Sequence, residues 1–333
     1  MGRKITMPSM YGNAIPTFDS SAISGGLSFL VSELEKIDPK LREPLTSTTY
    51  PRDINIQSGG GWVESTSAMN VDYAAVGGNS ETGGIQNAIR RIQANVGKDV
   101  FKVLPYEITM GVKFVDMQRG AVTGRSIEQI YNTGIRLDYD KYMDSNTYIG
   151  NADYGTEGLV NQSKVTPVSV ATGAAAATEW KKKTPLEILT DINEAIMAGW
   201  AASGYDQTAI PNHILIPPTQ YGYLVTTMVS IAGVNGAISI LEYLKQNNIA
   251  KNKGVDLFIG ECRWCEKAGV GQKDRMICYV NEERFVGMDV PVPLTRAMTQ
   301  PVVANASYDS LYVSAVGQVK VHYTEPFVYR DGI

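Results

Sequence analysis

The amino-acid sequence predicts an α+β fold with a compact α/β unit in the second half of the chain. Thr184 is a typical helix N-cap, Pro185 fits the first turn, and Glu187 stands where a capping box needs a carboxylate. The apolar stretch His213–Ile216 has the length of a buried strand, and two prolines end it. Ser239–Gln246 predicts the second helix of the unit.

The helix that begins at Thr184 is predicted to bury one face. Its apolar side chains recur at helical spacing, at Leu189, Ile192, Ile196 and Trp200. A glycine at position 204 fits the left-handed residue that follows a last helical turn. This helix therefore has both of its ends and its buried face marked in the sequence.

The first half of the chain predicts a long hairpin. Alternating apolar residues predict strands within Asp53–Val76 and Val100–Val115. A glycine-rich tip at Gly77–Gly84 and a short amphipathic helix at Ile85–Ala94 are predicted between them. Two strands without a third cannot bury enough apolar area to be stable alone. We therefore expect the hairpin to lie on another surface.

The longest predicted helix covers residues 126–149. Ser126 and Gln129 suit a capping box at its start. Its apolar stripe consists of residues at helical spacing, namely Ile127, Tyr131, Ile135 and Tyr139. This helix separates the hairpin from the α/β unit.

Strands are predicted again in the last third of the chain. Asp256–Glu261 and Arg275–Val280 are predicted to pair with each other. Ser310–Val316 and Gln318–Val328 are predicted to pair as the two final strands, turning at Gly317.

The stretch Thr184–Asn248, with its capped helix, proline-ended strand and second helix, resembles the central domain of tailed-phage major capsid proteins with the Hong Kong 97 fold. The order of elements in the rest of the chain agrees with this resemblance. It implies a Hong Kong 97-like capsid fold with five parts. These are an N-terminal arm (1–50), an extended β-hairpin loop (51–110), a peripheral domain with a long spine helix at about 126–149 (111–183), an axial α/β domain (184–305), and closing strands that return to the peripheral domain (306–333).

The resemblance implies a major capsid protein that self-assembles into the icosahedral shell around a double-stranded DNA genome. The implied partners are other copies, in pentamers and hexamers, with a portal protein, a scaffold or protease, and decoration proteins. DNA would be enclosed without sequence-specific binding, and the protein would reside in the virion after assembly in the host bacterial cytoplasm. An encapsulin-like nanocompartment shell that encloses protein cargo is an alternative with the same fold. An uncharacterised cellular enzyme is the alternative of a different class.

Inter-subunit contacts are expected in two glycine-bearing segments. One belongs to the hairpin, and the other is the candidate for the loop that the axial domain of the family points at a five-fold or six-fold axis. The second segment falls within Gln207–Leu241, which contains no Asp, Glu, Lys or Arg. The candidate contact residues are Gly59, Trp62, Gly78, Asn79, Ser230, Gly233, Val234 and Gly236.

Composition is consistent with a protein covered by neighbours. Charged residues make up only 19% of the 333, and 18 tyrosines outnumber 7 phenylalanines. The net charge of −4 disfavours tight binding to the DNA backbone. The basic run Lys181–Lys183 is predicted to be a solvated hinge. The start of the chain lacks the apolar core of a signal peptide, and the Gln207–Leu241 stretch contains too many polar residues and glycines to predict a membrane span.

The sequence predicts no enzyme, cofactor or metal site. Cys262 and Cys265 form a CxxC pair, and Cys278 follows, but a zinc site needs a fourth ligand. The only two histidines, His213 and His322, do not stand at ligand spacing from these cysteines, and each is predicted to be structural. Motifs for nucleophilic or metal-dependent hydrolysis are absent from the sequence.

Overall fold

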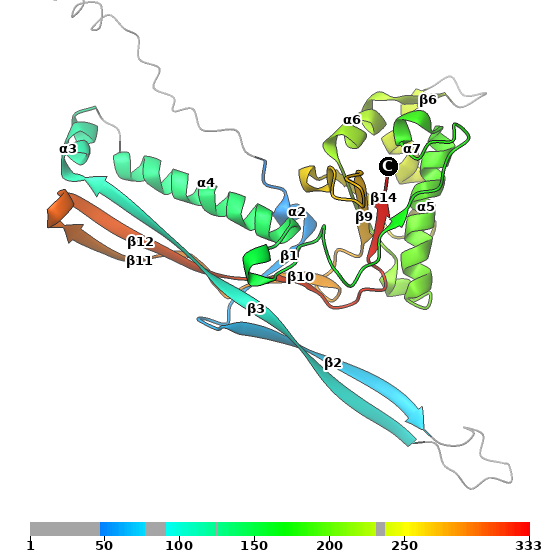
Figure 1. Cartoon of the computed structure of the whole chain (residues 1–333), viewed down its shortest axis with the longest axis horizontal. Coiled ribbons are helices and arrows are strands. Elements are labelled where there is room, and N and C mark those ends of the chain that lie inside the picture. Colours follow the sequence, from blue (N-terminus) through cyan, green and yellow to red (C-terminus); the bar gives the residue numbers. More distant parts are fainter. Residues whose placement is uncertain (1–46, 77–90, 124–125, 231–236) are drawn as a thin grey trace, which may run out of the picture. The chain divides into compact units, whose positions relative to one another are not determined.

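The computed structural model describes residues 47–76, 91–123, 126–230 and 237–333, which belong to one unit of the chain, Ser47–Ile333. Figure 1 shows the helices and strands of this unit. Helices and sheets both occur in it, as an α+β fold predicts. The predicted arm lies outside the described residues up to position 46, and the predicted tip Gly77–Gly84 also lies outside them.

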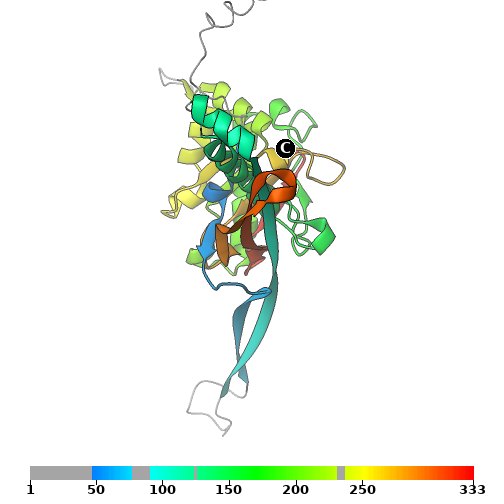
Figure 2. The same ribbon diagram turned by 90° about the vertical axis from the view of Figure 1, so that its left-hand side faces the viewer.

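A long antiparallel hairpin dominates the first part of the described chain (Figures 1 and 2). The short helix α2 (Tyr50–Asp53) and strand β1 (Asn55–Ser58) precede it. Strand β2 (Ser65–Val76) then pairs with β3 (Arg91–Lys113). A hairpin is therefore confirmed, but its strands differ from the predicted ones. Asn55–Ser58 pairs with β10 instead, and most of the predicted strand Val100–Val115 pairs with β12.

The predicted helix Ile85–Ala94 is wrong over residues 91–94, which are part of β3. Ile92 and Ala94 stand opposite Ala75 and Tyr73 of β2. Apolar residues alternate with polar ones along this stretch, and pairing with β2 selects the extended conformation over the helical one. Residues 85–90 lie outside the described part of the chain.

β3 changes its pairing partner halfway along its length. It pairs with β2 up to Lys102 and with β12 (Ser307–Gly317) from Val103 onwards. β11 (Val292–Val302) pairs with the other side of β12, so the sheet order is β11-β12-β3-β2. Pro105 lacks an N–H and is accommodated because this half of β3 is paired on one side only.

Two helices follow the hairpin. The chain turns directly from β3 into α3 (Phe114–Thr123), so the predicted strand Val100–Val115 runs two residues too far. The predicted helix at 126–149 is confirmed as α4 (Ile127–Tyr148). The Ser126 side chain accepts a hydrogen bond from the backbone N–H of Gln129 at 3.3 Å, as expected of its N-cap.

The predicted α/β unit is present with its helix caps. α5 covers Pro185–Ala202, and both hydrogen bonds of the Thr184–Glu187 capping box are formed. The φ angle of Gly204 is 65°, which is the left-handed conformation expected there. Strand β5 (His213–Ile216) has the predicted bounds and is completely buried.

One helix of this unit was not predicted. α6 (Pro218–Thr226) follows β5 directly and has a proline at its first position. Pro217 and Pro218 therefore end a strand and begin a helix, because a proline at the first helical position sacrifices no backbone hydrogen bond. The second predicted helix is confirmed as α7 (Ile240–Gln246), with Ser239 as its N-cap.

A five-stranded sheet lies at the centre of the α/β unit, in the order β4-β14-β9-β5-β8. The prediction that Asp256–Glu261 pairs with Arg275–Val280 is wrong, because β5 lies between these two strands and pairs with both. The other strands and helices of the described chain have the following bounds: β4 (Val168–Ser169), β6 (Met228–Ser230), β7 (Ala237–Ser239), β8 (Phe258–Glu261), β9 (Arg275–Tyr279), β10 (Val286–Val290), β13 (Val319–Val321), β14 (Val328–Asp331), α8 (Ile249–Asn252), and the 3₁₀ turns η1 (Ala152–Tyr154), η2 (Trp180–Lys182), η3 (Gln207–Ala209), η4 (Arg263–Cys265) and η5 (Val303–Asn305).

The end of the chain divides among three sheets instead of forming the predicted final hairpin. β12 joins β3, β13 joins β10, and β14 joins β9 and β4. Val316, Val319 and Tyr329 all enter one hydrophobic core, so the three sheets meet around the same buried cluster.

Hydrophobic cores cover both faces of the five-stranded sheet. Leu215 and Tyr279 enter one cluster together with Tyr148 of α4. Ile214 and Ile216 enter the other cluster together with α5. The alternation of a strand sends successive side chains to opposite faces, so a four-residue strand supplies two cores.

The basic run before α5 is only partly solvated. Lys181 and Lys182 are exposed, but Lys183 is buried and its Nζ lies 2.6 Å from Asp191 Oδ2. Trp180 Nε1 donates to the same oxygen at 2.9 Å. Burial raises the pKa of Asp191, although the bonds from Lys183 and Trp180 oppose this effect. The prediction of a solvated hinge is therefore wrong for Lys183.

A single buried carboxylate, Asp53, connects α2 with α4 and with the five-stranded sheet. Arg52 Nε donates to its Oδ1 at 2.7 Å, and His213 Nε2 lies 3.1 Å from the same oxygen. Tyr148 at the end of α4 donates to Oδ2. Burial alone would raise the pKa of Asp53, but the hydrogen bonds from His213, Arg52 and Tyr148 outweigh burial and lower it.

Replacing Lys183 by methionine is expected to destabilise the subunit by about 3–5 kcal/mol, because Asp191 would stay buried without its cation. Lys182→Met is the matched control, since Lys182 pairs with Glu179 on the exposed surface. Urea unfolding of unassembled subunits measures both free energies of unfolding. Equal, small losses for the two variants would contradict the role of the buried pair.

Acid is expected to remove stability that Asp53 provides. The lowered pKa means that this contribution is present above the ordinary Asp value of 3.8 and is lost as the pH falls through the folded-state value. Asp53→Asn should therefore lose less stability than the parent between about pH 6 and about pH 3, despite a lower stability at neutral pH. Asp72→Asn, on the exposed hairpin, should retain the parent's pH dependence. Urea midpoints across this pH range test the difference, and parallel curves for parent and Asp53→Asn would refute it.

Candidate assembly surface

The β2–β3 hairpin has one apolar face and one polar face. Residues that stand opposite each other in an antiparallel pair have side chains on the same face. The register of β2 and β3 therefore shows on which face of the hairpin each side chain lies. The apolar face consists chiefly of Met69, Val71, Tyr73, Ala75, Ile92, Ala94, Val96 and Val100, with Lys98 opposite Met69. The polar face carries Asn70, Asp72, Arg91, Gln93, Asn95 and Asp99, with mostly small residues between them and Phe101 opposite Thr66.

The apolar face is open to solvent in the isolated subunit. Met69, Tyr73 and Ile92 are 74%, 75% and 76% exposed. A two-stranded ribbon has no second layer of its own to cover such a face. A contiguous, exposed apolar strip of this kind is typical of a protein–protein contact.

Two of the predicted contact residues lie at the base of this hairpin. Gly59 has a φ angle of 122°, which only glycine adopts readily, and is exposed. Trp62, three residues further on, is 66% exposed. Both therefore lie where a neighbouring copy could reach them, and their role in contacts stays a prediction.

Five of the other predicted contact residues lie outside the described residues. They are Gly78, Asn79, Gly233, Val234 and Gly236. Ser230 is the last residue of β6, which pairs antiparallel with β7.

Sequence reasoning missed the apolar face itself. Met69, Val71 and Tyr73 recur at every second position, as do Ile92, Ala94 and Val96. This period-two signal could have identified the face, but a helix was predicted over part of the second set. The candidate residues were instead chosen at the loops.

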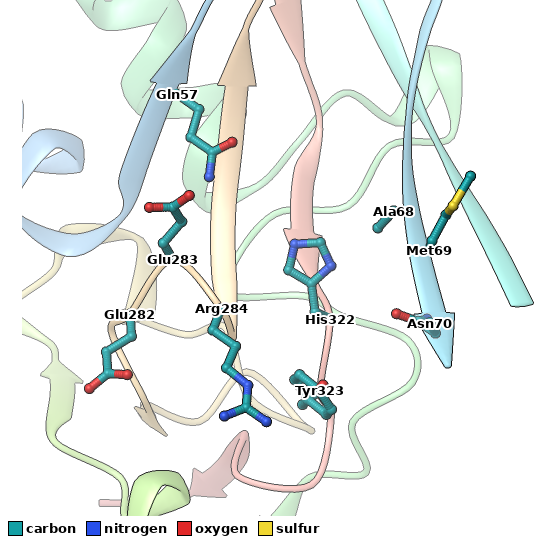
Figure 3. Close-up of a pocket in the computed structure, with 9 residues that line it drawn as sticks. All are labelled: Gln57, Ala68, Met69, Asn70, Glu282, Glu283, Arg284, His322 and Tyr323. Carbon is teal, nitrogen blue, oxygen red and sulfur yellow. The ribbon is translucent and has the colours of Figure 1, made fainter. Parts of the chain in front are cut away.

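A pocket of about 600 Å³ lies at the base of the hairpin (Figure 3). Glu282, Glu283 and Arg284 line it on one side, Asn70 on the hairpin lines it on the other, and His322 lies between them. Burial is the main cause that lowers the pKa of His322, and the nearby positive charge of Lys320 lowers it further. The residues that line this pocket include no serine, threonine or cysteine.

The three cysteines do not form one cluster. Cys262 and Cys265 enter the core beside α4, whereas Cys278 enters the core beside α5 on the opposite face of the sheet. Burial raises the pKa of Cys265, and burial raises that of Cys278 to about 12. Thiols of this kind are poor nucleophiles at neutral pH. Within the described ranges, no group of three or more His, Cys, Asp or Glu side chains could hold a metal ion.

His213 has a structural role in the fold. Its ring stacks on Phe258 with centroids 4.5 Å apart, and it contacts Asp53 in the buried cluster described above. In the part of the chain that the structure describes, no helix is long and apolar enough to cross a membrane.

Comparison with known proteins identifies the family of the chain. The model of the major capsid protein family matches residues 79–333. None of the curated proteins matches the chain in sequence.

Solved capsid structures share the fold. The capsid protein of Myoviridae phage XM1 is 17% identical, with a TM-score of 0.73 over 91% of this chain and 98% of that one. The capsid of a native GTA particle is 11% identical, with a TM-score of 0.60 over 95% and 99%. Gordonia phage Cozz gives 13% identity and a TM-score of 0.56 over 98% and 99%. The mixed helix-and-sheet fold is thus of the Hong Kong 97 type.

The family match favours a phage head shell over both alternatives, the protein-cargo nanocompartment and the cellular enzyme. The chain belongs to the major capsid protein family, and it is a structural protein of a phage capsid, not an enzyme.

Proposed function

We propose that copies of this chain form pentamers and hexamers of an icosahedral shell, in which the apolar face of the β2–β3 hairpin packs on a neighbouring copy. The observation that carries this proposal is the exposed strip around Met69, Tyr73 and Ile92. Covering it removes apolar area from water at every contact in the shell, and many modest contacts sum to a stable particle.

The packing of α4 supports a role as the spine of a peripheral domain. Tyr139 of α4 hydrogen-bonds to Ser314 of β12 at 3.0 Å, and Ile135 packs with Met110 and Val112 of β3. The helix thus supports the sheet from which the hairpin extends. The proposed peripheral domain comprises residues 111–183, and the proposed axial domain comprises residues 184–305.

The α/β unit around α5 is the proposed axial domain. β6 and β7 pair antiparallel, and the chain that joins them contains the predicted axis loop. The GTA capsid whose fold is similar was computed with C5 symmetry. This likeness supports a five-fold arrangement in which that loop approaches the axis.

The enclosed genome is proposed to be double-stranded DNA, held without sequence-specific contacts. The net charge of −4 supports confinement rather than tight binding, because backbone binding needs clustered cations. A portal protein, a scaffold or protease, and decoration proteins are the proposed further partners. The proposed location is the virion, after assembly in the bacterial cytoplasm.

Val96→Asp should prevent shell formation while leaving the subunit folded. Val96 lies on the apolar face and is 67% exposed in the isolated chain. Each contact would lose about 1.5–3 kcal/mol of apolar burial and would have to desolvate a carboxylate. Sedimentation and electron microscopy measure assembly, and circular dichroism checks folding.

Gln93→Asp introduces the same side chain on the polar face of the same strand. It should assemble like the parent. Normal shells from Val96→Asp, or equal failure of both variants, would show that the apolar face is not the contact.

A further inference from the structure

A hollow of about 270 Å³ lies at one edge of the five-stranded sheet, where β4 and β14 meet the second half of α5. Ala198 and Ala202 of α5 line it, and their small side chains leave the space open. Phe327 and Val168 supply an apolar wall, and Val168 is 48% exposed. The hollow is therefore shaped by the fold and is accessible from the surface.

Two cations line this hollow without an ionic partner. Arg330 Nη2 donates to the backbone oxygen of Glu194 at a long 3.4 Å, whereas its Nε is buried and has no hydrogen-bond partner. Lys164 is exposed, and it forms no ion pair within the described part of the chain. Glu325 is the one carboxylate among the lining residues, and it pairs with neither cation. A buried donor without an acceptor is costly, so the site is incomplete in the isolated subunit.

We propose that in the assembled shell this hollow receives an aspartate or glutamate side chain from a second copy of the chain. The inference rests on the proposed function, since only assembly brings a second copy to the site. A guanidinium matches a carboxylate with two parallel hydrogen bonds, and the ammonium of Lys164 adds a second positive charge at the rim. The apolar wall can pack against the methylene groups of the entering side chain.

The edge of the sheet supports a polypeptide as the occupant. β4 pairs with β14 on one side only, so the backbone groups on its other side are free to pair with an extended segment. Nucleic-acid phosphates could accept from the N–H groups of such an edge, but they carry no donor for its C=O groups and gain nothing from the apolar wall. A neighbouring chain can use both while its carboxylate reaches Arg330.

Carbodiimide coupling tests this contact directly. The reagent activates a carboxylate, Lys164 Nζ attacks the activated carbon, and a urea leaves with the carboxylate oxygen as an amide bond forms. Shells are assembled from a mixture of unlabelled and heavy-nitrogen-labelled chains, and cross-linked peptides are read by mass spectrometry. In shells, Lys164 should couple to an Asp or Glu, and some of the cross-linked pairs should join one labelled peptide to one unlabelled peptide, which shows that they come from two chains. Dissociated subunits should lack this product.

Internal controls separate the possible failures. Lys182 should couple to Glu179, 2.9 Å away in the same chain, in shells and subunits alike. Arg330→Gln should lower the Lys164 coupling in shells at least about threefold, because the entering carboxylate loses its main donor. Lys164→Arg should remove the product while retaining the charge and the shell.

If shells form and Lys164 couples only to Glu325, to nothing, or to a different protein, the inference is wrong. If no shells form from the parent chain, the proposed function is wrong. Sedimentation before the coupling reaction detects this case and separates it from a failure of the inference alone.

Discussion

The buried carboxylate of Asp53 is the point on which the described fold depends. It receives hydrogen bonds from Arg52 beside it and from Tyr148 at the end of α4, and it contacts His213 at the start of β5. A buried charge must be paired, so these groups cannot separate without a large cost. Because β1 and the hairpin follow directly after Asp53, the same contacts set where the hairpin leaves the body.

The hairpin has an apolar face that the rest of the subunit does not cover. Folding buries apolar area around Tyr279 and α5, yet it leaves Met69, Tyr73 and Ile92 in water. The subunit is therefore folded but incomplete, and the hydrophobic effect that remains unused favours association. This division suits a protein that must be soluble before assembly and stable afterwards.

Much of the fold could be predicted wherever local signals and tertiary packing agree. The caps at Thr184 and Ser126 and the buried strand His213–Ile216 are each signalled by neighbouring residues, and all three were predicted from sequence. Strand partners were not, because β5 enters between β8 and β9 through contacts distant in sequence. Lys183 shows the same limit, since its burial depends on an ion pair with Asp191, eight residues later in the chain. For the candidate site, the period-two pattern could have shown an apolar side on each strand, but joining the two sides into one face needed the β2–β3 register.

The change of partner along β3 has a mechanical consequence. Residues up to Lys102 are held by β2, and those from Val103 onwards are held by β12. Two backbone hydrogen bonds overlap this junction, because Val103 N–H donates to the Glu64 oxygen at 3.1 Å and Gln318 N–H donates to the Lys102 oxygen at 3.0 Å. A load on the hairpin therefore passes along one continuous strand into the sheet of β11 and β12.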